Sequence, residues 1–422
     1  MRVERRSRVA SLAALILASV PGALAAANAP EAAAAAELPL GSRSLDERRE
    51  RATVAPGVRW TSIVREGGPW RVNVLAIERA ALDGRLGGVL ANDRIAGLER
   101  PSAMARRTGA AAGVNGGFFA VDGDPVGALA IDGQLLSEPV RGRSALLVPS
   151  DPTRPARVER LRFAGSVSGG AAGATRILDG VERRRGVIPA CGGRGGDLPT
   201  ERPNSALTCV DASELVLISE RFGAARARGG IEAEVRGGVV VRVGPPRETT
   251  VARGSQVLSG SGDAARFLRD AAAPGSSPLV DLSVLAAGVP LALAEHGLVV
   301  GGGPRLLKRG RVSVAARHEG FAPLEAPGFF ASFVASRQPR TLAGVRRDGD
   351  VLIVTVDGRR PGWSAGVTLP EAARVMRSLG ARDALNLDGG GSTGMVVRGA
   401  VVNRPSDPSG ERAVSDGIFV LP

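Results

Sequence analysis

An aspartate followed by three glycines, within residues 384–397, is the part of this sequence best suited to chemistry. Residues 384–387 predict a short apolar strand that leads into Asp388, and the glycines after it allow the backbone to approach a ligand closely. Successive N–H groups in such a turn can face one concave point and bind an anion. Asn386 and Asp388 are two residues apart, so they project from one face of the strand, where core residues are expected. We therefore interpret this segment as a site more readily than as a plain hairpin corner.

The turn supplies a first set of candidate ligand contacts. The amides of Gly389, Gly390 and Gly391 are predicted to form the anion-binding turn, and the hydroxyl groups of Ser392 and Thr393 add donors at its rim.

Other polar residues stand at predicted strand ends. Asn115 ends a strand at the Gly116–Gly117 turn and is placed to contact a ligand. Arg340, next to Thr341, is a candidate bidentate clamp for phosphate. A structural interpretation stays open for each: the Phe pair after Gly117 suits a core, and an arginine is often simply solvated.

Seven motifs occur together in an order that resembles the phosphodiester glycosidase family. They are Asn115-Gly-Gly-Phe-Phe119, Gly302-Gly-Pro-Arg-Leu-Leu307, Arg340-Thr341 with Gly344, Val354-Thr-Val-Asp-Gly-Arg359, Gly366-Val-Thr-Leu369, Asn386-Leu-Asp-Gly-Gly-Gly-Ser-Thr393, and Asn403-Arg-Pro-Ser406 with Glu411-Arg412. They span residues 70 to 421. Gly394 stands where a second hydroxyl residue is expected, and residues 180–210 look particular to this branch.

The resemblance implies hydrolysis of a glycosyl–phosphate bond in a carbohydrate phosphodiester, with water replacing a phosphate monoester at the anomeric carbon. Because the leaving group is a stable anion, a strong general acid is less necessary than in ordinary glycosidases. We expect Asp388 to act as base or nucleophile, with Asp357 or Glu325 as a second carboxylate. Arg340 and Arg412 would hold the phosphate.

The same resemblance gives roles to the remaining candidates. Asn115, Gly116, Gly117, Thr341 and Asn386 are expected to contact the sugar, the phosphate or the water.

Two other functions are weighed against this one. A cationic secreted protein with glycine-rich loops could be a non-catalytic module that binds an anionic cell-wall polymer, but such a module gains nothing from carboxylates beside a phosphate site. A glycosidase acting on uncharged glycan is the other alternative, and a phosphate requirement would separate it. Neither His296 nor His318 lies in a Gly-x-Ser-x-Gly context, which argues against a Ser-His-Asp hydrolase.

Composition limits the cofactors and partners. The 55 Lys and Arg residues against 42 Asp and Glu give a net charge of +13, which attracts anions. The arginines are spread along the chain without interleaved aromatics, so nucleic-acid binding is not expected. Two cysteines and two distant histidines do not suit a zinc site. No cofactor or metal is predicted; calcium held by Asp122, Asp124 or Asp388 is the alternative.

The first residues indicate export. Residues 1–29 have a basic start, an apolar stretch and small residues before a cleavage site, as in a signal peptide. The mature protein is therefore expected to be secreted or held in the cell envelope, with no transmembrane segment after cleavage, because the longest later apolar run is too short to span a bilayer. In an oxidising compartment, Cys191 and Cys209 are expected to form a disulfide.

The remaining pattern predicts one domain. Residues 30–55 are expected to be a flexible lead-in and residues 56–422 the catalytic domain. Short strands separated by glycine, proline and Asp-Gly turns dominate, as in residues 71–77, 235–243 and 351–356. Helices are predicted over residues 370–379, with Thr368 as N-cap, and around residues 263–270. The expected fold class is α+β: a mainly antiparallel sheet with a few helices packed on it.

Overall fold

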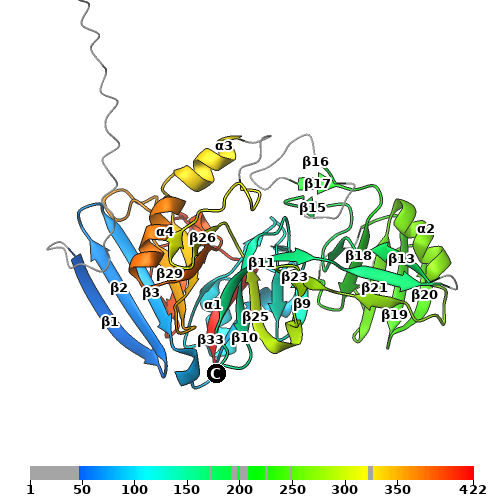
Figure 1. Cartoon of the computed structure of the whole chain (residues 1–422), viewed down its shortest axis with the longest axis horizontal. Coiled ribbons are helices and arrows are strands. Elements are labelled where there is room, and N and C mark those ends of the chain that lie inside the picture. The colour runs from blue at the N-terminus through cyan, green and yellow to red at the C-terminus, as the bar shows by residue number, and fades with distance from the viewer. Residues whose placement is uncertain are drawn as a thin grey trace, which may run out of the picture. The chain divides into compact units, whose positions relative to one another are not determined.

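The computed structural model describes residues 47–170, 173–191, 197–199, 208–223, 227–247, 250–321 and 327–422. These residues form a mostly antiparallel, sheet-dominated fold with few helices (Figure 1). The predicted α+β class with a mainly antiparallel sheet is confirmed at this level, although the sheets outweigh the helices. The predicted signal peptide, the lead-in up to residue 46 and Glu325 lie outside the described residues.

An eight-stranded sheet contains the strand that leads to Asp388. Its strands, in spatial order, are β1 (Glu47–Ala55), β2 (Val58–Arg65), β3 (Trp70–Ile77), β29 (Val351–Val356), β28 (Arg340–Val345), β30 (Asp383–Asn386), β26 (Arg305–Lys308) and β27 (Arg311–Val312). Residues 47–55 were predicted to belong to a flexible lead-in; they instead form β1, which pairs with β2 along its length.

Two further sheets pack against the eight-stranded sheet. The seven-stranded sheet is β24 (Val289–Pro290), β23 (Val284–Ala286), β11 (Arg157–Phe163), β10 (Ser144–Pro149), β25 (His296–Gly301), β8 (Leu129–Ile131) and β9 (Gln134–Ser137). The C-terminal sheet is β32 (Ala400–Val401), β31 (Met395–Val397), β5 (Ala112–Asn115), β33 (Asp416–Leu421) and β4 (Arg85–Leu90). Buried side chains from all three sheets, such as Leu385, Leu146 and Ile418, form one core cluster.

The other face of the eight-stranded sheet is covered by helix α4 (Leu369–Ser378). Because residues alternate along a strand, Leu342 of β28 faces α4 while its neighbour Ala343 faces the first core. Thr368 caps α4 as predicted, through a capping box with Glu371. The predicted helix around residues 263–270 is α2 (Gly262–Ala271). The other α-helices of the described residues are α1 (Pro101–Thr108) and the short α3 (Pro327–Phe330).

Residues 166–281 form a separate group of small sheets around α2. A five-stranded sheet, here called the insert sheet, is β14 (Gly180–Val181), β18 (Leu215–Ser219), β21 (Ser255–Gly260), β19 (Ile231–Arg236) and β20 (Val239–Gly244). A three-stranded sheet of this group is β13 (Ala174–Ile177), β12 (Ser166–Gly169) and β22 (Leu279–Asp281), and another is β15 (Ile188–Pro189), β17 (Thr208–Val210) and β16 (Leu198–Pro199). Outside the group, β6 (Phe118–Phe119) pairs with β7 (Pro125–Val126). Residues 235–243, predicted as one strand, are instead a hairpin that turns at Gly237–Gly238, both with positive φ.

Candidate functional site

Asp388 lies where β30 ends, half-buried at the edge of a cavity of about 420 Å³. The amide of Gly389 donates to its Oδ1 at 2.9 Å. Burial raises the pKa of Asp388 to about 6; the Ser392 hydroxyl, the Gly389 amide and the charge of Arg412 oppose the rise, and the nearby Asp416 adds to it. A carboxyl group with a pKa near 6 is ionised at neutral pH yet accepts a proton more readily than an ordinary aspartate.

The glycine turn uses the amides of Gly389 and Gly390 within the protein, which leaves the predicted anion-binding turn with fewer donors. The Gly389 amide donates to Asp388 itself, and the Gly390 amide donates to the carbonyl of Pro339 at 2.9 Å. The amides of Ser392 and Thr393 also close short turns within the segment. Both hydroxyl residues are buried, with about 2% and 1% of their surface exposed. The glycines serve close packing instead: a Cβ on Gly391 would lie 2.2 Å from both Arg412 and Asp407.

Asn115 supports this turn from inside the protein, and it is not among the residues that line the cavity. It is fully buried at the end of β5, where its Nδ2 donates to the carbonyl of Asp388 at 2.8 Å. Its Oδ1 accepts from the Thr341 hydroxyl at 2.7 Å and from the amide of Gly394 at 3.2 Å. The predictions that Asn115 and Thr341 bind substrate are therefore wrong: both side chains are used inside the protein to fix the position of Asp388.

Asp416 is a second buried carboxylate near Asp388 that sequence reasoning missed. It begins β33 and accepts the amide of Gly117 at 3.0 Å and the hydroxyl of Ser415 at 2.6 Å. A Cβ on Gly116 would collide with Asp416, so glycine is required there, and the Gly116 carbonyl accepts the amide of Asp388 at 3.2 Å. Gly116 and Gly117 thus join two carboxylate-bearing strands. The only sequence signal for Asp416 is an aspartate that opens an otherwise apolar segment.

Two arginines share the cavity with Asp388. Arg412, a predicted site residue, lines it and forms a bidentate ion pair with Asp407, with a shortest distance of 2.8 Å. Arg143, which sequence reasoning missed, lies 4.3 Å from the ring centre of Phe321. Within the described residues, its side chain makes one hydrogen bond, from Nε to the carbonyl of Glu319 at 3.3 Å. Burial lowers the pKa of Arg143 to about 10, so it is still charged at neutral pH.

Arg340 does not reach the cavity. Only about 2% of its surface is exposed, and its guanidinium donates to the carbonyls of Phe333 at 2.6 Å, Val367 at 3.1 Å and Ser336 at 3.3 Å. Its predicted role as a phosphate clamp is therefore wrong, because its donors hold the segment 333–336 against β28.

Asn386 and Asp357 are also structural. Asn386 is fully buried and donates to the carbonyls of Gly303 and Leu387. Asp357 is about 1% exposed and accepts from Trp363 Nε1 at 2.8 Å, the Arg404 amide at 3.0 Å and Asn403 Nδ2 at 3.2 Å. Asp357 is not among the described cavity residues, which contradicts its predicted role as second catalytic carboxylate.

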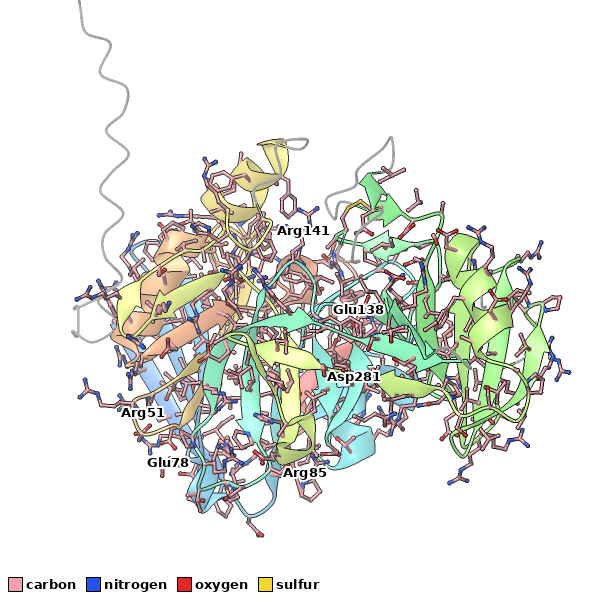
Figure 2. All side chains as sticks on the ribbon, turned by 45° about the vertical axis from the view of Figure 1, so that its right-hand side comes forward. Arg51, Glu78, Arg85, Glu138, Arg141 and Asp281 are labelled. Carbon is pink, nitrogen blue, oxygen red and sulfur yellow. A yellow bond between two sulfur atoms is a disulfide. The ribbon has the colours of Figure 1, made fainter. Side chains whose placement is uncertain are left out.

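The predicted disulfide between Cys191 and Cys209 is present and borders the cavity. Ala190, next to Cys191, lines the cavity and packs against Val126 and Val140. Its carbonyl accepts Nε of Arg141, labelled in Figure 2, at 2.7 Å. This hydrogen bond attaches the segment with the disulfide to the loop before β10. Arg143 is the last residue of that loop.

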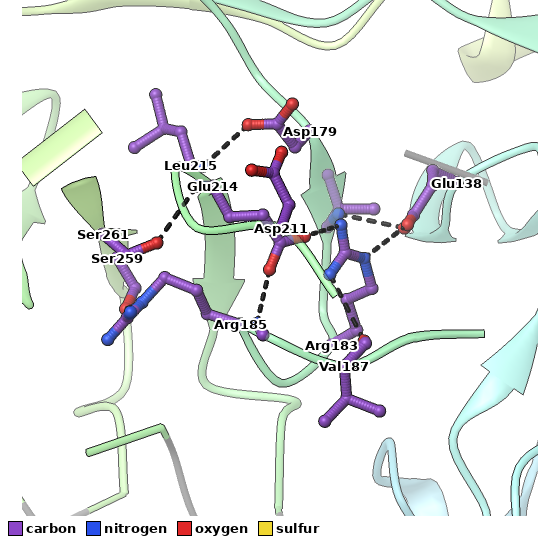
Figure 3. Close-up of polar contacts among 12 residues, drawn as sticks. Glu138, Asp179, Arg183, Arg185, Val187, Asp211, Glu214, Leu215, Ser259 and Ser261 are labelled. Atoms are coloured by element: carbon purple, nitrogen blue, oxygen red, sulfur yellow. Dashed lines mark hydrogen bonds and ion pairs between the residues drawn. The ribbon is translucent and has the colours of Figure 1, made fainter. Parts of the chain in front are cut away.

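A second cluster of charges is buried where the insert sheet meets β9 (Figure 3). Arg183 pairs with Glu138 at 2.7 Å and with Glu214 at 2.5 Å, and all three side chains are at most 4% exposed. Asp179 accepts the amide of Leu215 at 2.7 Å, and Glu182 accepts the amide of Ser219 at 3.0 Å. Burial raises the pKa values of Asp179 and Glu182 to about 7. We refer to these five residues as the Arg183 cluster.

Within the described part of the chain, no group of three or more His, Cys, Asp or Glu side chains is placed to hold a metal ion. Asp124 is buried, and its amide donates to Asp122 at 3.3 Å. Independence from calcium stays a prediction.

The described part of the chain includes no helix that is long and apolar enough to cross a membrane.

Comparison with known proteins finds a family match over part of the chain. Residues 229–421 match the model of the phosphodiester glycosidase family. A stretch of 84 residues is 40% identical to the SPbeta prophage-derived uncharacterized protein YomE of Bacillus subtilis, and one of 80 residues is 36% identical to the N-acetylglucosamine-1-phosphodiester alpha-N-acetylglucosaminidase of Mus musculus. The chain spans only 13% and 15% of the lengths of these relatives. Residues 229–421 are thus similar to the phosphodiester glycosidase family, as the resemblance in the sequence predicted.

A solved structure is similar over a longer range. A presumed exported protein of Burkholderia pseudomallei K96243 is 28% identical, with a TM-score of 0.79, and the similarity covers 92% of this chain and 98% of that one. The fold therefore extends well beyond the residues that match the family model. Asp388 and Arg412 lie inside the matched residues, whereas Asn115 and Arg143 lie outside them.

Proposed function

We propose that the protein is a hydrolase that cleaves the glycosyl–phosphate bond of a sugar-1-phosphodiester and releases a free sugar and a phosphate monoester. The observation that carries the proposal is the meeting of Asp388, Arg143 and Arg412 at one cavity. A carboxylate can activate water or attack the anomeric carbon, and two guanidinium groups can bind the phosphate and its developing charge. The family domain supports the same reaction class.

The reaction needs one carboxylate and one anion site. Ionised Asp388 accepts a proton from water as the water oxygen bonds to the anomeric carbon, or it bonds to that carbon itself and is released by water afterwards. The bond between the anomeric carbon and the phosphate oxygen breaks, and its electron pair leaves with the phosphate. Arg143 and Arg412 stabilise that anion, although the charge of Arg412 is partly balanced by its ion pair with Asp407. Because the leaving anion is stabilised in this way, a general acid is dispensable.

We also propose that the chain is exported. The signal-like residues 1–29, the disulfide and the similarity to a presumed exported protein all support an oxidising compartment.

The test is product release from α- and β-linked sugar-1-phosphodiesters and from the matching uncharged glycosides, with and without a chelator. We expect cleavage of the phosphodiesters alone and no effect of the chelator. Cleavage of uncharged glycosides at the same rate would contradict the phosphate requirement. Tight binding of an anionic cell-wall polymer with no cleavage would instead identify a binding module.

A further inference from the structure

One wall of the cavity is built from phenylalanine rings. Phe118, Phe321, Phe329 and Phe333, here called the phenylalanine wall, line the cavity in a chain that has only ten phenylalanines and no tyrosine. Phe333 stacks on Phe321 and on Phe329 with ring centres 5.2 and 5.1 Å apart. Phe118 lies 5.8 Å from Phe321. Phe118, Phe329 and Phe333 are half-buried, so the wall keeps surface available to a ligand.

The other described residues that line the cavity are mostly apolar as well. Apart from Asp388, Arg143 and Arg412, every described lining residue is apolar; besides the wall these are Phe119, Ala120, Val121, Val126 and Ala190. Among these described residues, no side chain offers a hydroxyl or an amide. A leaving group rich in hydroxyls would lose water here and find few side-chain partners among the described residues besides Asp388, Arg143 and Arg412, which is unfavourable. A hydrocarbon chain would gain from the same burial.

The charges define which part of a substrate meets the wall. The guanidinium of Arg143 is stacked on Phe321 at 4.3 Å and lies 5.8 Å from the ring centre of Phe118. A phosphate held by Arg143 would therefore lie close to these rings, and one of its two ester substituents can lie against them. Val121, another lining residue, is 95% exposed and extends the apolar surface toward solvent. The volume of about 420 Å³ is in the range of small-molecule sites.

We propose that the leaving group is the phosphate monoester of a lipid-like alcohol, whose hydrocarbon chain lies along the phenylalanine wall. This inference rests on the proposed hydrolase function and specifies its substrate class. Linear alkyl and branched isoprenyl chains share the chemistry that the wall recognises. Sugar or polyol phosphates do not, because they require the hydrogen-bonding side chains that the described lining lacks.

The experiment compares sugar-1-phosphodiesters that share one sugar and differ in the leaving alcohol: methanol, butanol, octanol, an isoprenol and glycerol. We expect kcat/KM to rise by about two- to fourfold per methylene added between methyl and octyl, as for hydrocarbon burial in a pocket. Glycerol should be no better than methanol. The octyl and isoprenyl compounds distinguish linear from branched chains.

Two neighbouring phenylalanines provide the matched variants. Phe329→Ala removes part of the wall, whereas Phe330→Ala changes the next residue, which packs against Arg317 at 5.9 Å and does not line the cavity. We expect Phe329→Ala to reduce kcat/KM for the octyl ester by about tenfold or more, with the methyl ester nearly unchanged. Phe330→Ala should keep the full chain-length dependence. Phe329→Leu keeps an apolar side chain and should retain most of the chain-length dependence.

The outcomes separate the two proposals. Cleavage of all esters at similar rates, or a preference for glycerol, overturns the lipid inference and leaves the hydrolase function intact. An equal loss on methyl and octyl esters in Phe329→Ala would place the sugar, not the chain, against the wall and would also overturn it. If no phosphodiester is cleaved, the hydrolase function fails and the inference fails with it. Thermal melting of each variant shows whether folding is retained.

Discussion

Two of the clusters of arginine and carboxylate side chains among the described residues use their charges differently. In the Arg183 cluster, the guanidinium is held between Glu138 and Glu214, and every side chain is nearly inaccessible. At the cavity, the Asp388 carboxylate accepts the Gly389 amide, Arg143 donates to the carbonyl of Glu319, and both side chains line the cavity. The first arrangement satisfies its charges within the protein, whereas the second leaves them available to a ligand.

The difference shows why shifted pKa values do not identify a site by themselves. Burial raises the pKa of Asp179 and Glu182 as much as that of Asp388. Asp179 and Glu182 accept backbone amides of β18 and so fasten the insert sheet. Of these three carboxylates, only Asp388 combines the shift with a position at a cavity that Arg143 and Arg412 also line, and this combination is what points to chemistry.

The largest effect is expected from Asp388→Asn. The amide keeps the shape but cannot accept the proton or attack carbon, so kcat should fall by about a thousandfold or more. The variant should be at least as stable as the parent at pH 7.5, because burying an amide costs less than burying a carboxylate. Steady-state kinetics and thermal melting measure both.

Asp383→Asn is the control for that change, because it lies at the opposite end of β30 and accepts the amide of Arg309 at 3.1 Å. It should retain parental kcat. Comparable loss in both variants would mean that damage to the strand, not chemistry at Asp388, explains the result.

Arg183→Met should mainly lower stability. Removing the guanidinium leaves Glu138 and Glu214 buried without their partner, at a cost of about 3–5 kcal/mol in the free energy of unfolding. Urea denaturation measures the change. At temperatures where the variant is folded, kcat/KM should stay within about twofold of the parent. A large loss of activity in fully folded protein would contradict the division between the two clusters.

Arg143→Met should instead lower activity and leave stability nearly unchanged. Its hydrocarbon side chain still packs on Phe321, so the free energy of unfolding should change by less than about 1 kcal/mol. We expect kcat/KM to fall by about 10²-fold, because the phosphate loses a charged donor. A matched Arg340→Met variant should lose stability instead, since it leaves three buried carbonyls without a donor.

The smallest effect concerns pH, and it has opposite signs for activity and stability. Activity that requires ionised Asp388 should fall about tenfold per unit below the pKa of about 6. Asp388, Asp179 and Glu182 all bind protons more tightly in the folded than in the unfolded state, so the free energy of unfolding should increase as pH falls from about 8 to 5. Denaturation and kinetics at pH 7.5 and 5.5 check this; lower stability at pH 5.5 would contradict it.

Local sequence signals predicted much of the fold and one central residue. The capping residue Thr368, the apolar segment 351–356 and the strand before Asp388 depend on neighbours in sequence, and all were correctly placed. Only residues close in sequence are needed for such predictions. The hairpin at Gly237–Gly238 was missed because two glycines between apolar residues were taken as part of a strand.

The choice of arginine could not be made locally. Arg340 lies on the strand beside Asp388 and is covered by carbonyls of residues 333, 336 and 367. Arg143 comes from the start of β10, in another sheet, and meets Asp388 only through tertiary packing. The sequence contains too many arginines for composition or spacing to distinguish these two. Asp416 was missed for the same reason, since it approaches the Gly116–Gly117 turn across the C-terminal sheet.

The position of β33 between β5 and β4 has a consequence for synthesis. During translation, Asn115 and Arg143 emerge long before Asp416, which ties the Gly117 amide to β33. The turn at Asp388 therefore lacks one of its supports until β33 has been made and has paired with β5. A ribosome-bound chain, or one trimmed so that it lacks β33, should be inactive even with Asp388 present, so enzymatic activity would report that the C-terminal sheet has closed.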